Sequence, residues 1–229
     1  MVTCSRAKII QKPWTRLPRG CLRELELMTH VKEWWEFVNP YRYGINPPQL
    51  NTIEDFVSGI LCNDSRRINF CLWEARQNRS TLFALFERLA VVPSPPLESK
   101  VAFHSAWITQ GLWVRDDFSI DPLLPAVLAN LLPGYSGPAT ELFRGDRWSN
   151  HEAGTYGPSW STKRSVAEMF AGGLNRCPET GGVVLRTLAP AHAILAGPTP
   201  GLHMDEEAEY IVDRRQLAKV EVIERFPPH

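Results

Sequence analysis

Apolar residues recur three and four positions apart through most of residues 1–135, which is the spacing of one face of a helix. Proline-containing segments interrupt these runs, and proline and the residue before it disfavour continuation of a helix. The longest interruption is Pro93-Ser94-Pro95-Pro96. The pattern predicts helices over Leu22–Val38, Thr52–Cys62, Arg67–Gln77, Ser80–Leu89, Leu97–Gln110 and Pro122–Leu132.

The pattern changes after Gly137 to short apolar runs separated by glycine-rich loops. Runs of this kind, rich in β-branched residues, are typical of strands. They predict strands over Glu141–Arg144, Val183–Leu188, Ala208–Val212 and Lys219–Arg225 and a helix over Lys163–Ala171. We therefore predict an α+β protein with a helical region over residues 1–135 and a β core over residues 136–229.

The composition is that of a folded globular protein, with 44% hydrophobic and 22% charged residues among 229. Lys and Arg together number 25 and so do Asp and Glu. No net charge therefore steers the protein toward nucleic acid or an anionic membrane. The polar start of the chain lacks the apolar stretch of a signal peptide, and we expect a protein that acts in a cytoplasm, its own or that of a target cell.

Cysteine and histidine are scattered along the chain. The five cysteines form no CxxC pair, which favours reduced thiols over a disulfide framework. The six histidines show no HExxH spacing. We predict no metal site.

Three segments of the C-terminal half contain residue types that carry chemistry: Leu142–Gly145, Ser159–Thr162 with the following Val166–Phe170, and Glu206–Val212. Each has an ordinary structural explanation. An arginine is common at the end of a strand, a serine or threonine caps helices, and an acidic cluster is common in a solvated turn. These ordinary explanations suit each segment alone, but they do not account for all three segments occurring in this order.

The strand ending in Arg144-Gly145, the Trp160-Ser161-Thr162 segment before a helix, and Glu207-x-Glu209 before an apolar strand together resemble the Arg-Ser-Glu signature of ADP-ribosyltransferases. The resemblance covers the chain from about Glu141 onward. It implies a split β-sandwich that holds NAD between two small sheets.

The resemblance implies that Glu209 lies beneath the nicotinamide ribose. Breaking the bond to nicotinamide creates an oxocarbenium-like carbon, which a carboxylate stabilises. Glu207 is two residues earlier, and on an extended segment it shares the face of Glu209. In the family, the first glutamate of this motif is associated with transfer of ADP-ribose to arginine. If the strand register is shifted, Glu206 takes the place of Glu207 in the motif.

The resemblance also assigns the residues around NAD. Arg144 reaches the phosphates or the ribose, and the backbone of Gly145 binds the carboxamide of nicotinamide. Ser161 hydrogen-bonds the catalytic carboxylate. Two further predictions concern the neighbouring side chains.

Thr162 is predicted to cap the following helix. Trp160 or Phe170 packs against nicotinamide in one interpretation, and both belong to the hydrophobic core in the other.

We therefore expect a mono-ADP-ribosyltransferase that uses NAD as a substrate, releases nicotinamide and modifies a macromolecule, with a protein arginine as the expected acceptor. Two alternatives stay open. The first is an NAD glycohydrolase of the same fold. The second is a protein-binding module in which the fold has lost its activity and the tryptophan-rich helical region makes the contacts.

Overall fold

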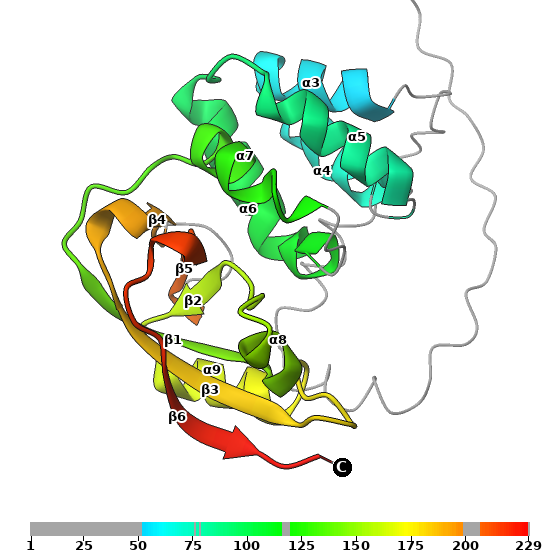
Figure 1. The fold of residues 1–229 in the computed structure, drawn as a ribbon. Coiled ribbons are helices and arrows are strands. Elements are labelled where there is room, and N and C mark those ends of the chain that lie inside the picture. The colour runs from blue at the N-terminus through cyan, green and yellow to red at the C-terminus, as the bar shows by residue number, and fades with distance from the viewer. Residues whose placement is uncertain (1–51, 76, 78, 116–119, 199–206, 229) are drawn as a thin grey trace, which may run out of the picture. The chain divides into compact units, whose positions relative to one another are not determined.

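The computed structural model describes residues 52–75, 77, 79–115, 120–198 and 207–228 (Figure 1). The chain divides into two compact units, residues 1–51 and 52–229, and the fold below is that of the second. The predicted helix over Leu22–Val38 lies outside the described residues.

Among the residues that the structure describes, five helices precede the sheet, and their bounds confirm the predicted apolar periodicity. They are α3 (Thr52–Cys62), α4 (Ser65–Ala75), α5 (Arg79–Ala90), α6 (Leu97–Arg115) and α7 (Leu124–Leu131). Helix α6 continues past its predicted end at Gln110. None of the described helices is long and apolar enough to cross a membrane.

Six strands follow: β1 (Thr140–Arg147), β2 (Ser159–Ser161), β3 (Gly182–Ala189), β4 (Ile194–Ala196), β5 (Glu209–Val212) and β6 (Glu221–Phe226). They form one sheet of order β4-β5-β2-β1-β3-β6, and every neighbouring pair is antiparallel. Strand β4 was not predicted, because Ile194–Ala196 is too short to show an alternating pattern.

Strand pairing is least extensive in the middle of the sheet, between β1 and β2. Strands β1 and β3 pair along the whole of β1, whereas β1 and β2 pair only at Phe143 and Ser161. Two three-stranded halves, β4-β5-β2 and β1-β3-β6, therefore meet at a single register pair. The sequence led us to expect two small sheets, and the hydrogen bonding connects them into one sheet that is nearly split.

One face of the β1-β3-β6 half is covered by α9 (Arg164–Gly172). Ala167 and Ala171 of this helix pack with Val184 and Phe143 of the strands. A short helix, α8 (Trp148–Glu152), follows β1 directly. It was not predicted, since five residues show no helical periodicity.

The helices α3 to α7 and the sheet share a hydrophobic core. The largest buried cluster contains helical residues such as Phe56 and Trp107 together with Ala196 of β4 and Ile211 of β5. The described helices and the strands belong to one compact unit, residues 52–229. Helices α3 to α7 pack on the β4-β5 end of the sheet (Figure 1).

Candidate functional site

Strands β2 and β5 bring two of the predicted site residues side by side. Ser161 and Glu209 are direct partners in the antiparallel register, so their side chains leave the same face of the sheet. Ser159, two residues before Ser161, lies on the same face of β2. Ser161, which we predicted to hydrogen-bond the Glu209 carboxyl, is thus its register partner, but the Ser161 hydroxyl donates to the backbone carbonyl of Glu207.

Glu209 lies in an environment that favours its protonated form. Burial raises the pKa of Glu209 from 4.5 to about 7. The hydrogen bond from Ser159 lowers this pKa, the negative charge of Glu207 raises it further, and the positive charge of Arg144 lowers it. A carboxyl group that titrates near neutral pH is a common property of catalytic acids and bases.

Glu207 is placed differently from the prediction. It lies before β5, and Ala208 between the two glutamates has a φ of 46°. The backbone therefore turns at Ala208 and is not extended, so the prediction that Glu207 and Glu209 share a strand face is wrong. Burial also raises the pKa of Glu207. Glu206, the alternative partner, lies outside the described residues.

Ser161 fixes the backbone around this turn. Its hydroxyl donates to the carbonyl of Glu207 at 2.6 Å and accepts from the backbone N–H of Lys163 at 2.9 Å. Helix α9 begins after Lys163, and no side chain caps it. The prediction that Thr162 caps the helix is therefore wrong; Thr162 is exposed.

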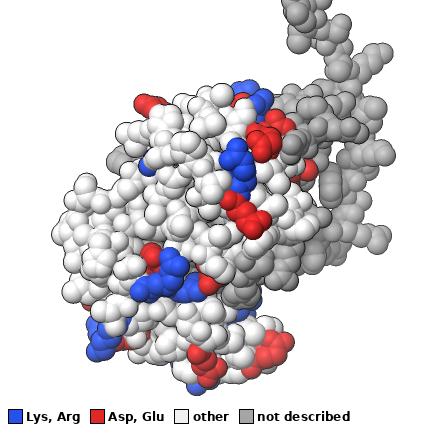
Figure 2. Space-filling view, turned by 45° about the horizontal axis from the view of Figure 1, so that its top comes forward, with Lys and Arg blue, Asp and Glu red and all other residues white. Residues whose placement is uncertain are grey.

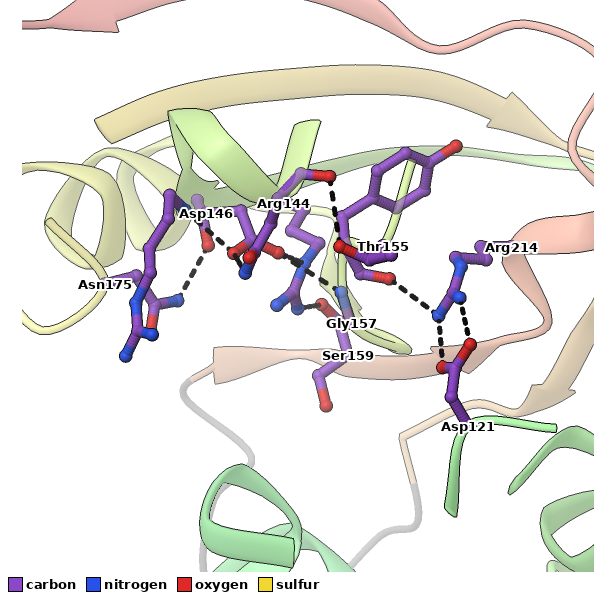
Figure 3. Close-up of polar contacts among 12 residues, drawn as sticks. Asp121, Arg144, Asp146, Thr155, Gly157, Ser159, Asn175 and Arg214 are labelled. Atoms are coloured by element: carbon purple, nitrogen blue, oxygen red, sulfur yellow. Dashed lines mark hydrogen bonds and ion pairs between the residues drawn. The ribbon is translucent and has the colours of Figure 1, made fainter. Parts of the chain in front are cut away.

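Arg144 is buried, with 4% of its side chain exposed, and its hydrogen bonds go to the protein interior (Figure 3). Its Nε donates to Asp146 Oδ2 at 2.7 Å, and its Nη1 donates to the carbonyl of Ser159. Its Nη2 is also buried and has no hydrogen-bond partner among the described residues. Of the three guanidinium nitrogens of Arg144, only Nη2 thus lacks a partner and is available for the predicted contact with NAD.

Asp146 is the site residue that the sequence analysis missed. Its carboxylate is fully buried and accepts four hydrogen bonds: Oδ2 from Arg144 and the N–H of Gly157, and Oδ1 from the N–H of Arg147 and the Asn150 side chain. The available signal was the i, i+2 spacing of Arg144 and Asp146 on one strand, which puts both on the same face. A buried charge pair at this position ties β1, α8 and the loop before β2 together.

Gly145 has a packing role. A Cβ atom at this position would lie 2.0 Å from the carbonyl oxygen of Ala167 and 2.5 Å from the N atom of Ala171. Its own carbonyl accepts a hydrogen bond from the buried side chain of Asn175 at 2.8 Å. Glycine is therefore required for α9 to pack on β1, and its carbonyl already accepts one hydrogen bond from Asn175. The contact of the Gly145 backbone with nicotinamide stays a prediction.

Trp160 and Phe170 had two interpretations, nicotinamide contact or core. Trp160 is 2% exposed and belongs to the hydrophobic cluster of the sheet, where its ring meets that of Tyr156 edge to face. Phe170 is half-buried on α9, and its Cβ lies against Gly145. Trp160 thus has the environment of a core residue.

A small pocket lies apart from this group of residues, where α7 meets the ends of β4 and β5. It is lined by apolar side chains and by Asp121, Asp213, Arg214 and Arg215. Arg214 and Asp121 form a paired salt bridge there, at 2.5 and 2.8 Å (Figure 3). None of Arg144, Ser161 and Glu209 lines this pocket.

On the face drawn in Figure 2, the described basic and acidic side chains lie in mixed groups, without a patch of one sign. Among the described residues, no three His, Cys, Asp or Glu side chains lie close enough to hold a metal ion. Comparison with protein-family models, curated proteins and solved structures finds no match to this chain.

Proposed function

We propose that this protein is a mono-ADP-ribosyltransferase that cleaves NAD, releases nicotinamide and transfers ADP-ribose to a protein arginine. The observation that supports this proposal best is the Ser161 and Glu209 pair on adjacent strands, with a Glu209 carboxyl that titrates near neutral pH. The order of the three segments along the chain, which resembles the Arg-Ser-Glu signature, also supports it.

Glu209 supplies the chemistry of the first step. The bond between nicotinamide and ribose breaks, and its electron pair stays on the nitrogen of nicotinamide. The ribosyl carbon is left electron-poor. The anion of Glu209 is poorly solvated, so a developing positive charge beside it is stabilised more strongly than it would be in water.

Glu207 supplies the acceptor chemistry. A guanidinium group is charged at ordinary pH, and a partly desolvated carboxylate is a receptor for it. Attack by a guanidine nitrogen forms the new bond to the ribosyl carbon, and one proton leaves that nitrogen. Glu207 orients the guanidinium and accepts this proton.

Hydrolysis of NAD is a second candidate function, and the turn at Ala208 is the observation that favours it. Glu207 is not on the strand face of Glu209, since the backbone is left-handed between them. The Glu207 carboxylate that would bind an acceptor arginine is then not held on a rigid strand. A water molecule attacks the ribosyl carbon instead and loses a proton.

The glutamates can be separated by substitution. Glu209→Gln should lower nicotinamide release by about 100-fold or more, because the transition-state charge loses its counter-ion. Glu207→Gln should retain nicotinamide release but lose transfer of labelled ADP-ribose to an arginine-containing peptide. Equal loss of both activities in Glu207→Gln would contradict the separate roles, and release without transfer in the unaltered protein would favour the hydrolase.

The pH dependence of nicotinamide release gives a second test. Glu209 acts as an anion, and its pKa is about 7, so kcat/KM should rise with pH and level off above about 8. A flat profile between pH 5 and 8 would remove Glu209 from the reaction.

A further inference from the structure

The connection between α5 and α6 contains the segment Pro93-Ser94-Pro95-Pro96, which takes no part in the proposed function. Proline fixes its own φ and keeps the residue before it out of the helical region. Val92, Ser94 and Pro95 each precede a proline. The segment is therefore held extended, and residues 93–96 belong to no helix or strand.

Burial along this segment repeats every three residues. The buried side chains are three positions apart, at Val92 and Pro95. The two positions after each of them are exposed, and these are Pro93, Ser94, Pro96 and Leu97. A period of three is that of a polyproline II helix, whose side chains form three edges along its length. One edge thus packs on the protein, and the other two face solvent.

The buried edge is fixed at both ends. Val92 is 5% exposed within the main hydrophobic cluster, and its carbonyl accepts a hydrogen bond from the Asn130 side chain of α7 at 2.9 Å. Helix α6 begins directly after the segment, and the N–H of Lys100 donates to the carbonyl of Pro96 at 3.1 Å. The segment is therefore ordered before any partner arrives, so binding to it loses little conformational entropy.

The two free edges are apolar. Val91 is 72% exposed and Leu97 is 60% exposed, and both lie on the same edge as Ser94. The other edge consists of the rings of Pro93 and Pro96, which the rise of a polyproline II helix places about 9 Å apart. Exposed prolines in this conformation are bound by grooves lined with aromatic side chains.

The charges at the two ends of the segment narrow the kind of groove. Glu87 lies in the last turn of α5 and Glu98 in the first turn of α6, and both are exposed. Arg88 is paired with Glu54. A groove with basic side chains at its rim complements this arrangement.

We propose that residues 91–97 form a docking ridge for a partner protein whose groove is lined with aromatic rings and has a basic rim. The groove takes the edge of Pro93 and Pro96 and the edge of Ser94 and Leu97. The edge of Val92 and Pro95 stays packed on the helices. This inference does not depend on the proposed function, and its test needs no NAD.

The experiment is a titration of the nitrogen-15-labelled full chain with purified SH3 and WW domains, one at a time, up to about 1 mM. At least one domain should shift the backbone amide signals of Val91, Ser94 and Leu97. The side-chain amide signals of Asn130 should stay in place, because its bond to Val92 is retained.

Three variants then test the ridge against the domain that binds. Pro93→Ala combined with Pro96→Ala should weaken binding by about tenfold or more, since the proline rings and the preordered backbone are both lost. Leu97→Ala keeps every proline and should weaken binding by about threefold. Pro122→Ala is the matched control, because Pro122 is an exposed proline outside the ridge.

Four results would overturn the proposal. The first is that no domain shifts the ridge signals, and the second is that the double proline variant binds as tightly as Pro122→Ala. The third is movement of the Asn130 signals with binding, which would mean that the segment leaves the core. The fourth is a shift of the ridge signals on dilution of the protein alone, which would mean that a second copy of the chain covers the ridge.

Discussion

The helical region and the sheet bury different kinds of residue. The interior of α3 to α7 consists mainly of aliphatic and aromatic side chains such as Phe56 and Trp107. Its buried polar residues, Ser99, His104 and Gln110 of α6, include no carboxylate, lysine or arginine. The buried charged residues of the described chain all belong to the sheet or its connections: Arg144, Asp146 and Asp213. Apolar burial stabilises a fold, whereas buried charges reduce stability unless they are fully bonded. The contrast indicates that helices α3 to α7 contribute mainly apolar burial, and the buried charges lie in the sheet, where we propose the active site.

The largest expected effect on stability comes from the helical core. Phe103 is fully buried on α6 and contacts the rings of Phe56 and Trp107. Phe103→Ala should lower the free energy of unfolding by about 3–5 kcal/mol, through lost burial and the cavity left behind. Leu97→Ala on the same helix, at a side chain that is 60% exposed, is the control. Equal effects in urea denaturation would contradict the assignment of the core.

A smaller effect of opposite sign is expected from the sheet. The folded protein binds the proton of Glu209 up to about pH 7, whereas an unfolded glutamate loses it near 4.5. Between these values stability falls as pH rises, because the unfolded state binds fewer protons. Glu209→Gln should therefore be more stable than the unaltered protein by up to about 3 kcal/mol at pH 8 and show no gain near pH 4.

The measurement is the free energy of unfolding of both proteins from pH 4 to pH 8. Glu152→Gln, at an exposed position, should show no such dependence. If the gain in stability of Glu209→Gln over the unaltered protein were no larger at pH 8 than at pH 4, the carboxyl of Glu209 would not be desolvated. This result would weaken the contrast between the two regions.

The salt bridge between Asp121 and Arg214 connects the two regions, because Asp121 precedes α7 and Arg214 follows β5. Its two hydrogen bonds are at 2.5 and 2.8 Å, and both side chains are partly buried. Asp121→Asn should cost about 1–2 kcal/mol in unfolding free energy. A double-mutant cycle with Arg214→Gln should show that the losses are not additive. Additive losses would mean that the pair does not couple the regions.

The smallest effects distinguish two adjacent residues at the start of α9. Ser161→Ala removes the hydrogen bonds to Glu207 and from Lys163, and it should cost about 1 kcal/mol. Thr162→Ala should change stability by less than about 0.5 kcal/mol, since Thr162 is exposed and caps nothing. If thermal unfolding showed a larger loss of stability for Thr162→Ala than for Ser161→Ala, Thr162 would cap α9 as the sequence predicted.

The sequence predicted the fold well where a pattern was long. Helix α3 has its predicted bounds, and β3 and β6 lie within a residue or two of theirs. Short elements such as β4 and α8 were missed because three to five residues contain too little periodicity. Strands β1 and β2 pair at one position, and the Arg144 side chain bonds the carbonyl of Ser159 in place of further backbone hydrogen bonds. No local sequence pattern predicts such an arrangement.

The candidate site was predicted in part. The resemblance to the ADP-ribosyltransferase signature singled out Ser161 and Glu209, which the register makes direct partners. It misplaced Glu207, because the turn at Ala208 requires a positive φ that alanine rarely adopts. It missed Asp146, whose importance comes from donors on three different elements.

The most direct test of the proposed activity is incubation of the protein with NAD labelled in its ADP-ribose part and a cell lysate, beside Glu209→Gln. Nicotinamide release and label on macromolecules are followed together. The proposed function predicts both signals for the unaltered protein, label on arginine side chains, and neither signal for Glu209→Gln. Absence of both signals from the unaltered protein, or equal signals from the two proteins, would contradict it.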